Sequence, residues 1–162
     1  MEKEYQGYFA DCYVLVPYRT KGFIHSFLDH FIPDWVESAE EYEIPQYSGD
    51  PIAVFESASG LIDYLVKKPD EHHSIYWRNT GKSEIRGAMC FFTNDGYVIA
   101  GLYCETTFPD TTIEDNLLFD LKKFCKSDSG FITYEEPPPQ NAIDFLKRVK
   151  ATNNESERRK KQ

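Results

Sequence analysis

The sequence predicts a single α+β domain with a mixed, largely antiparallel sheet of about six strands and about four helices. Runs with apolar residues at helical spacing alternate with runs rich in β-branched and aromatic residues, and the turn "TNDG" joins two of the latter. No internal repeat divides the chain. The predicted order is β-α-β-α-β-β-β-α-β-α over residues 1–150, and residues 151–162 are expected to form a disordered basic tail.

The first strand is predicted at "DCYVLVP", residues 11–17, which is apolar on both faces and therefore belongs in the interior of a sheet. A helix that ends near Pro33 follows it. The buried face of this helix is formed by Phe23, Phe27, Leu28 and Phe31. Asp34 is a suitable cap, so we expect one or two further helical turns before Pro45.

A short strand is predicted at residues 52–56, and Ser57 is placed to cap the helix that follows. Residues 73–79 form the next strand. The following run, 85–105, contains the clearest local signal, because Gly96 in "TNDG" can adopt a positive φ in a hairpin turn. We therefore expect an antiparallel meander from Tyr76 to Tyr103.

The last third of the domain is predicted as helix, strand and helix. Thr111 with Glu114, or Thr112 with Asp115, provides a capping box for the first helix. A strand at residues 130–136 leads through three prolines to the final helix. We expect the helices to lie mainly on one face of the sheet.

The net charge of −9 is unevenly distributed along the chain. Residues 1–149 hold 25 acidic and 13 basic side chains, whereas residues 150–162 hold two acidic and five basic ones. An acidic body repels the phosphates of nucleic acids but favours a basic protein partner. No apolar run is long enough to span a membrane and no signal peptide is recognisable, so a soluble, cytoplasmic protein is expected. The oligomeric state stays open.

The four cysteines are too widely spaced for a zinc site, and we expect buried free thiols in a reducing compartment. They are Cys12, Cys90, Cys104 and Cys125. No nucleophile elbow, phosphate-binding loop or dinucleotide fingerprint occurs. No cofactor or metal is therefore predicted, and the sequence favours a non-catalytic protein while leaving enzymatic activity open.

The stretch "TYEEPPP" places Glu135 and Glu136 between a strand and a helix. Adjacent strand residues point to opposite faces, whereas a pair of catalytic carboxylates must converge on one bond. We interpret the stretch as a rigid connector with solvated glutamates.

Residues 34–47 interleave aromatic rings with carboxylates, the composition of a surface that binds a basic partner. The predicted partner-binding residues are Trp35, Glu37, Glu40, Glu41, Tyr42 and Tyr47. In size and charge the chain is similar to small acidic immunity proteins, which neutralise bacterial toxins by occluding their active sites. The leading hypothesis is a non-catalytic inhibitor-type binding module.

The alternative is a small-molecule-binding protein or an enzyme with a pocket near His72, His73, Tyr76 and Arg78. Adjacent histidines before a strand can bind metal, but no further ligand pair accompanies them, so a polar ligand pocket is the better form of this alternative.

Overall fold

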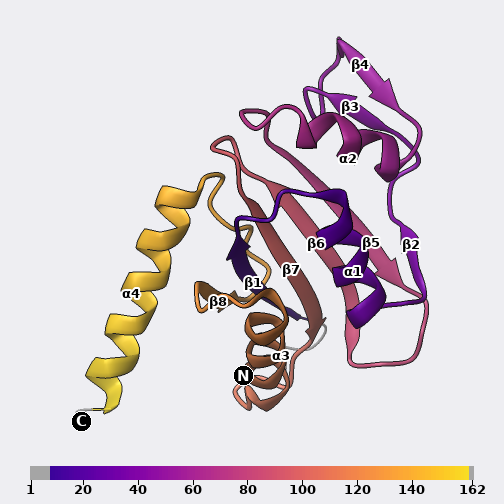
Figure 1. The fold of residues 1–162 in the computed structure, drawn as a ribbon. Helices are drawn as coiled ribbons and strands as arrows, with labels where there is room; N and C mark the ends of the chain where they lie inside the picture. The colour runs from indigo at the N-terminus through magenta and orange to yellow at the C-terminus, as the bar shows by residue number, and fades with distance from the viewer. Residues whose placement is uncertain (1–7, 161–162) are drawn as a thin grey trace.

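The computed structural model describes residues 8–160 (Figure 1). The strands are β1 (Phe9–Val16), β2 (Trp35–Glu37), β3 (Tyr42–Ile44), β4 (Ala53–Phe55), β5 (His73–Asn79), β6 (Ile85–Phe92), β7 (Val98–Glu105) and β8 (Gly130–Thr133). The helices are α1 (Lys21–Phe31), α2 (Ala58–Val66), α3 (Thr112–Cys125) and α4 (Ala142–Lys160).

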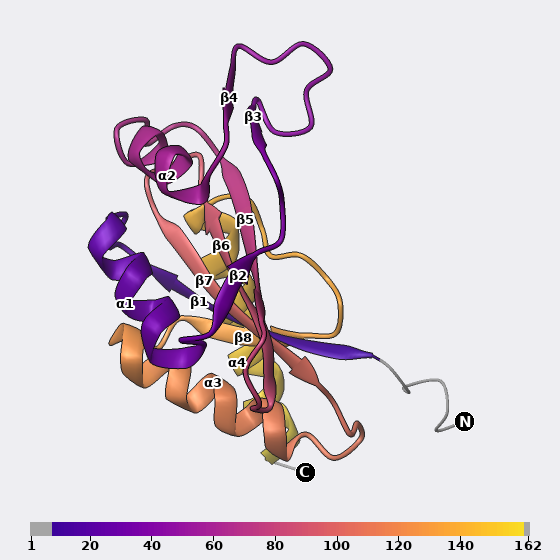
Figure 2. The same cartoon turned by 90° about the vertical axis from the view of Figure 1, so that its right-hand side faces the viewer.

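Six strands form one sheet in the order β2-β5-β6-β7-β1-β8, and β3 pairs with β4 in a separate two-stranded sheet. All strand pairings in residues 8–160 are antiparallel. The α+β class, the six-stranded sheet, the four helices and the predicted order are confirmed, and β2 and β3 are added to that order. The β3–β4 sheet and the loop between its strands, here called the finger, project beyond the main sheet (Figure 2).

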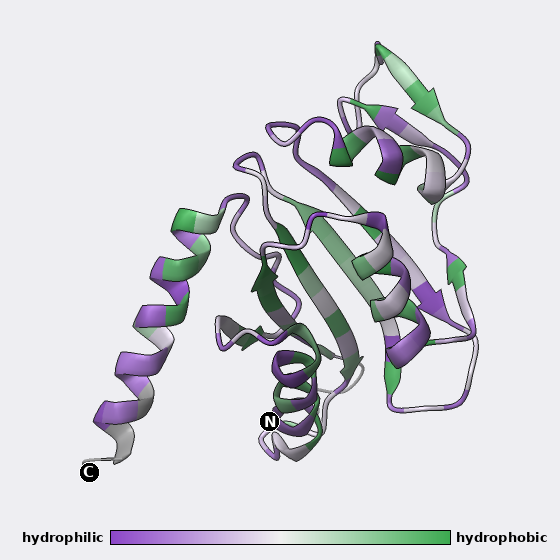
Figure 3. Cartoon of the chain, in the orientation of Figure 1, coloured by the Kyte–Doolittle hydropathy of each residue, from purple (hydrophilic) through white to green (hydrophobic). Residues whose placement is uncertain are grey.

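The main sheet has a core on each face. Helices α1, α2 and α3 cover one face, on which β1 places Cys12, Val14 and Val16. Helix α4 covers part of the other face, where Tyr13 and Leu15 pack with Phe145 and Val149. Strand β1 is thus buried on both sides between β7 and β8, as its sequence predicts. The central strands are strongly hydrophobic, whereas α4 alternates in character in its first turns and is hydrophilic towards its C-terminal end (Figure 3).

Local signals account for several element boundaries. The Ser57 hydroxyl accepts a hydrogen bond from the Gly60 amide at the start of α2, and Gly96 has a φ of 92° in the β6–β7 hairpin, both as predicted. The capping box at α3 was wrong. Thr111 makes no capping bond there, and the Asp110 carboxylate accepts the Thr112 amide at 3.0 Å instead.

The helical prediction for residues 34–45 was also wrong, because this segment forms β2 and β3. Trp35 to Glu37 pair with β5, which would otherwise be an open edge of the sheet. Satisfying that edge outweighs the weak helical propensity of the segment.

At the C-terminus, α4 continues through residues 151–160, where a disordered tail was predicted, and residues 161–162 of that predicted tail lie outside the described residues. Packing of Phe145 and Val149 anchors the first turns, and extending an existing helix is far easier than starting one.

Arg19 ties together segments from both halves of the chain. Its side chain is buried beneath the β6–β7 hairpin, with the guanidinium carbon 5.1 Å from the centre of the Phe92 ring. Burial lowers the pKa of Arg19 from its ordinary value. The guanidinium donates to the carbonyl oxygens of Leu65 (3.1 Å), Lys68 (2.7 Å), Glu71 (2.9 Å), Thr93 (2.7 Å) and Tyr97 (3.2 Å). The end of α2, the loop that leads to β5 and the hairpin are therefore held by one side chain.

Replacing Arg19 by Met should destabilise the fold by at least about 3 kcal/mol, because buried carbonyl oxygens lose a charged donor. Urea unfolding monitored by tryptophan fluorescence measures this loss. Arg86→Met is the matched control, because Arg86 is exposed and its ion pair with Glu105 is long at 3.8 Å. The free energy of unfolding of this variant should stay within about 0.5 kcal/mol of wild type. Equal unfolding midpoints for the two variants would contradict this role for Arg19, and Arg19→Lys should fall between them.

Candidate functional site

Some residues of the predicted acidic and aromatic surface hold the fold together, and others are exposed to solvent. The Glu37 carboxylate accepts hydrogen bonds from the Tyr42 hydroxyl and the Ala58 amide, both at 2.9 Å. Tyr42 is buried, and Trp35 packs against the main core. These three predicted residues therefore attach the finger and α2 to the body.

The exposed members of the predicted set are Glu40, Glu41 and Tyr47, of which Tyr47 is 82% exposed. Two exposed apolar side chains of the finger were not identified from the sequence, Ile52 (79%) and Val54 (48%). The exposure of Val54 could have been expected from the sequence, because successive side chains of a strand point to opposite faces and those of Ile52 and Val54 therefore share one face. Residues 22–66, which include the finger, hold nine carboxylates and no lysine or arginine.

The predicted histidine pocket is only partly assembled. His73 is 2% exposed, and its ring nitrogens lie 2.9 Å from the Glu43 carbonyl oxygen and 3.1 Å from that of Ser74. Burial lowers the pKa of His73 below its ordinary value, although both carbonyl oxygens favour the charged ring. His72, His73 and Tyr76 line a cavity of about 340 Å³, whereas Arg78 does not line it.

Gln46 holds the finger against the sheet and was not identified from the sequence. Its side-chain oxygen accepts the Ser74 amide at 2.9 Å, and its side-chain nitrogen donates to the Ser74 carbonyl at 3.1 Å. The side chain thus replaces a neighbouring strand at the edge of β5. This anchoring places Gln46 and Tyr47 beside Tyr76, on the face of the sheet that α4 covers only in part.

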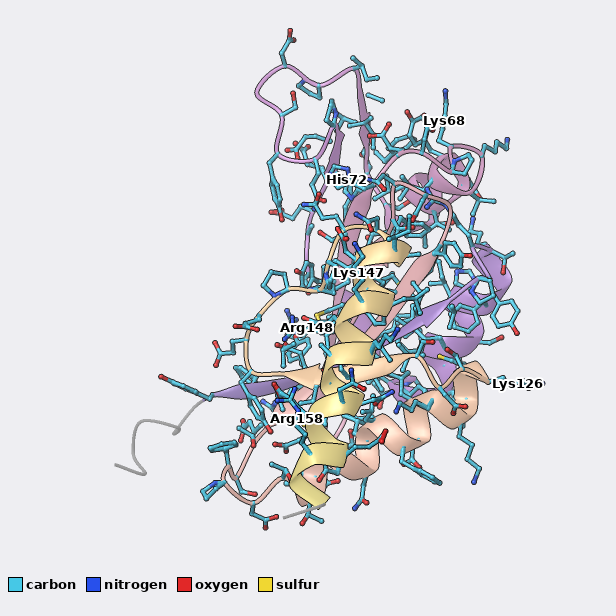
Figure 4. All side chains as sticks on the ribbon, turned by 90° about the vertical axis from the view of Figure 1, so that its left-hand side faces the viewer. Lys68, His72, Lys126, Lys147, Arg148 and Arg158 are labelled. Atoms are coloured by element: carbon cyan, nitrogen blue, oxygen red, sulfur yellow. The ribbon has the colours of Figure 1, made fainter. Side chains whose placement is uncertain are left out.

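Three adjoining cavities of about 190, 340 and 430 Å³ lie along this part of the sheet and are together called the sheet groove. The second and third share Tyr76 and Pro137. The lining residues that the first two have in common are Gln46, Tyr47, His73, Ser74 and Tyr76. The groove therefore runs from the finger to the outer end of β1. Figure 4 views the molecule from the side of α4, with His72 towards the finger and Arg148 on α4.

The sheet groove is acidic and rich in aromatic rings. The carboxylate residues that line it are Asp11, Glu41, Glu43, Glu135 and Glu136. Its ring-bearing residues include Phe9, Tyr13, Tyr42, Tyr47, Tyr76, Phe91, Phe92 and Tyr103. Within the described part of the chain, no lysine or arginine lines it.

The connector after β8 forms one wall of the groove. Glu135 has a φ of 62°, its amide donates to the Asp11 carboxylate at 2.9 Å, and its own carboxylate accepts the Phe9 amide at 3.0 Å. Glu136 forms an ion pair of 3.4 Å with Arg148, and its carbonyl oxygen accepts the Tyr13 hydroxyl at 2.8 Å. The connector is thus held in place, and both glutamates stay exposed to solvent, as predicted, although each also contacts a neighbouring residue.

Asp11 is the most deeply placed carboxylate of the groove. It is 8% exposed, and burial together with the charge of Glu135 raises its pKa to about 6. An acidic residue at the start of a strand that is apolar on both faces was the available sequence signal. The ionised form of Asp11 is therefore disfavoured by the fold that holds it.

All four cysteines are buried free thiols, as predicted. Across residues 8–160, no group of three or more histidine, cysteine, aspartate or glutamate side chains could hold a metal ion. None of the helices in this range combines the length and apolar character needed to cross a membrane.

No protein-family model matches the chain, and comparisons with curated proteins and with solved structures likewise give no match.

Replacing Asp11 by Asn should stabilise the protein at about pH 7.5 by roughly 1–2 kcal/mol. The folded-state pKa of about 6 exceeds the usual value for an unfolded chain, so the folded state binds more protons between about pH 4 and pH 6. The ionised carboxylate therefore reduces stability above this window, and the difference between variant and wild type should shrink as the pH falls towards about 4.

Urea unfolding of both proteins across this pH range measures the effect. Asp120→Asn, at an exposed position on α3, is the control and should change little at any pH. An Asp11→Asn protein no more stable than wild type at neutral pH would contradict the prediction.

Proposed function

We propose that the chain is a non-catalytic binding protein whose sheet groove and finger hold a basic segment of a protein partner. The observation that carries this proposal is a groove lined by five carboxylates and several rings, with no lysine or arginine among its described lining residues. Aromatic side chains provide contact area at protein interfaces, and complementary charge increases the rate of association.

The shape of the groove supports an extended polypeptide as the occupant. Three adjoining hollows follow one another across the sheet, which suits successive side chains of one segment better than a single compact molecule. The exposed Tyr47 and Ile52 of the finger add apolar contact at one end. The engaged ring nitrogens of His73 also support recognition over acid–base chemistry.

The chain would act as an inhibitor if the basic segment that it binds is part of the partner's active site. Proteins that act on nucleic acids use lysine and arginine to contact phosphates. A chain that covers those side chains would block access, which is the immunity-type function proposed from size and charge. Four buried free thiols are consistent with a reducing compartment, and we propose the cytoplasm as the location.

A small-molecule ligand is the second candidate. The cavity of about 340 Å³ beside His72 and Tyr76 lies at the lower end of the usual range for ligand sites, about 300–1,000 Å³. Arg78 does not line it and His73 is already engaged, so two of the four predicted pocket residues are not free to bind a ligand there.

Reversing the charge of Glu40 and Glu41 together, as Glu40→Lys with Glu41→Lys, should weaken binding of an oligo-arginine peptide by at least about tenfold at low salt. The double change Asp120→Lys with Asp128→Lys on and beside α3 gives the same net charge and should weaken binding by less than about threefold. Fluorescence anisotropy of the labelled peptide measures both affinities, and high salt should weaken wild-type binding.

Equal losses in the two double variants would show that only net charge matters, and would overturn the proposed site. A peptide that fails to bind wild type at low salt would overturn the function itself.

A further inference from the structure

We propose that the end of the sheet groove between β1, β5 and β7 is a subsite for one arginine side chain of the partner. This inference rests on the proposed function, because it names the group that the groove recognises. The subsite is the cavity of about 430 Å³, and its polar wall consists of Asp11, Glu135 and Glu136.

The aromatic floor of the subsite is locked in place before any ligand binds. The rings of Phe9 and Tyr103 meet edge to face with centres 5.7 Å apart, and those of Tyr76 and Phe91 do so at 5.9 Å. The Tyr103 ring also lies directly over Gly87, where any side chain would collide with it. The floor is therefore preorganised, which lowers the entropic cost of binding.

Gly101 has a similar role beneath Tyr13 and Met89. A Cβ atom there would lie 3.0 Å from the end of the Met89 side chain and 3.1 Å from the Tyr13 ring. The absence of a side chain lets both residues rest on the sheet. The resulting hollow is lined by aromatic residues and carboxylates together, the combination that binds cations through both charge and the ring quadrupole.

The negative charge of Asp11 favours binding of a cation in the subsite. Its ionised form is disfavoured by burial and by Glu135, and a positive group in the hollow would relieve both effects. Fold stability does not require this charge, since the carboxylate reduces stability at neutral pH. Such a group is typical of binding sites, where stability is given up for function.

Arg148 provides an internal example of the proposed contact. Its guanidinium carbon lies 4.9 Å from the centre of the Phe131 ring, and a terminal nitrogen lies 3.4 Å from the Glu136 carboxylate. One arginine on α4 thus already combines a ring face with a carboxylate at the wall of the groove. A planar guanidinium stacks on rings and reaches carboxylates with paired donors, whereas an ammonium is a compact and more strongly hydrated charge.

The charged groups around Asp11 define how the subsite responds to pH. Glu135 and Glu136 lie on the connector, Tyr13 on β1, Tyr76 on β5 and Tyr103 on β7. The positive charges of Arg78 and Arg86 act on Tyr103 from β5 and β6. Of the nearby groups with a resolved shift, only Asp11 has a pKa near 6, so affinity should fall as the pH decreases through this value.

The direct test is a titration of the folded chain with n-butylguanidinium, followed by backbone amide NMR shifts. We expect saturable millimolar binding centred on the amides of Asp11, Tyr103 and Glu135, with n-butylammonium binding more weakly. Asp11→Asn should weaken binding by roughly three- to tenfold, and wild-type affinity should fall similarly between about pH 7.5 and pH 5. Tyr103→Phe should retain binding and Tyr103→Leu should weaken it, while the control Asp120→Asn should match wild type.

Several results would overturn the subsite. These are no shifts at the three amides, equal affinity in Asp11→Asn and wild type, or tighter binding of n-butylammonium. Oligo-arginine binding separates this failure from that of the proposed function. If Asp11→Asn binds the peptide as tightly as wild type while the Glu40 and Glu41 double variant does not, the binding function holds and the subsite is wrong.

Discussion

The guanidinium of Arg19, enclosed by backbone carbonyl oxygens, holds in place the segments on which the sheet groove is built. Its bonds to Lys68 and Glu71 fix the loop that leads into β5, and its bond to Thr93 fixes the β6–β7 hairpin. That hairpin in turn holds the start of α4, because the Asp95 carboxylate accepts the Ala142 amide at 2.9 Å. The proline connector that lines the groove lies between β8 and this anchored helix. A single buried cation thus links the loop before β5, to which Gln46 fastens the finger, with the hairpin that holds the start of α4.

The charge of the molecule has two distinct uses. Arg19 is a buried cation whose donors are matched by carbonyl oxygens, so it contributes to the fold. Asp11 is a nearly buried carboxylate with a raised pKa, so its negative charge opposes the fold. A carboxylate placed as Asp11 is, on a preorganised aromatic surface, lowers stability but favours association with a positive partner. This contrast is the physical basis for treating the groove, and not the core, as the functional part of the chain.

The sequence predicted elements whose signals are local and failed where distant segments decide the outcome. Ser57 and Gly96 act within a few residues, so the α2 cap and the β6–β7 hairpin were predictable. Residues 34–45 form strands because β5 offers an edge, and that edge is invisible without the sheet order.

In the candidate site, too, local features were predictable from the sequence and contacts between distant segments were not. Its acidic and aromatic character was predictable from composition, and Glu41, Tyr47, His72 and Tyr76 were identified from the sequence. Members of both predicted sets line one groove, because Gln46 fastens the finger to the edge of β5. The predicted residues that do not line it are Trp35, Glu37, Glu40 and Arg78. Asp11 could be singled out at the start of its strand, but its place beside the connector could not be predicted, because the hydrogen bond from the Glu135 amide joins residues 124 positions apart in the sequence.

Hydrogen exchange of the chain with and without bound oligo-arginine peptide would test the central claim most directly, because it locates the contact on the folded molecule. The account predicts slower exchange at the edge of β5, in the finger and in the connector at residues 134–136, with α1 and the outer face of α3 unchanged. Slower exchange on α1 or α3, with the groove unaffected, would contradict it.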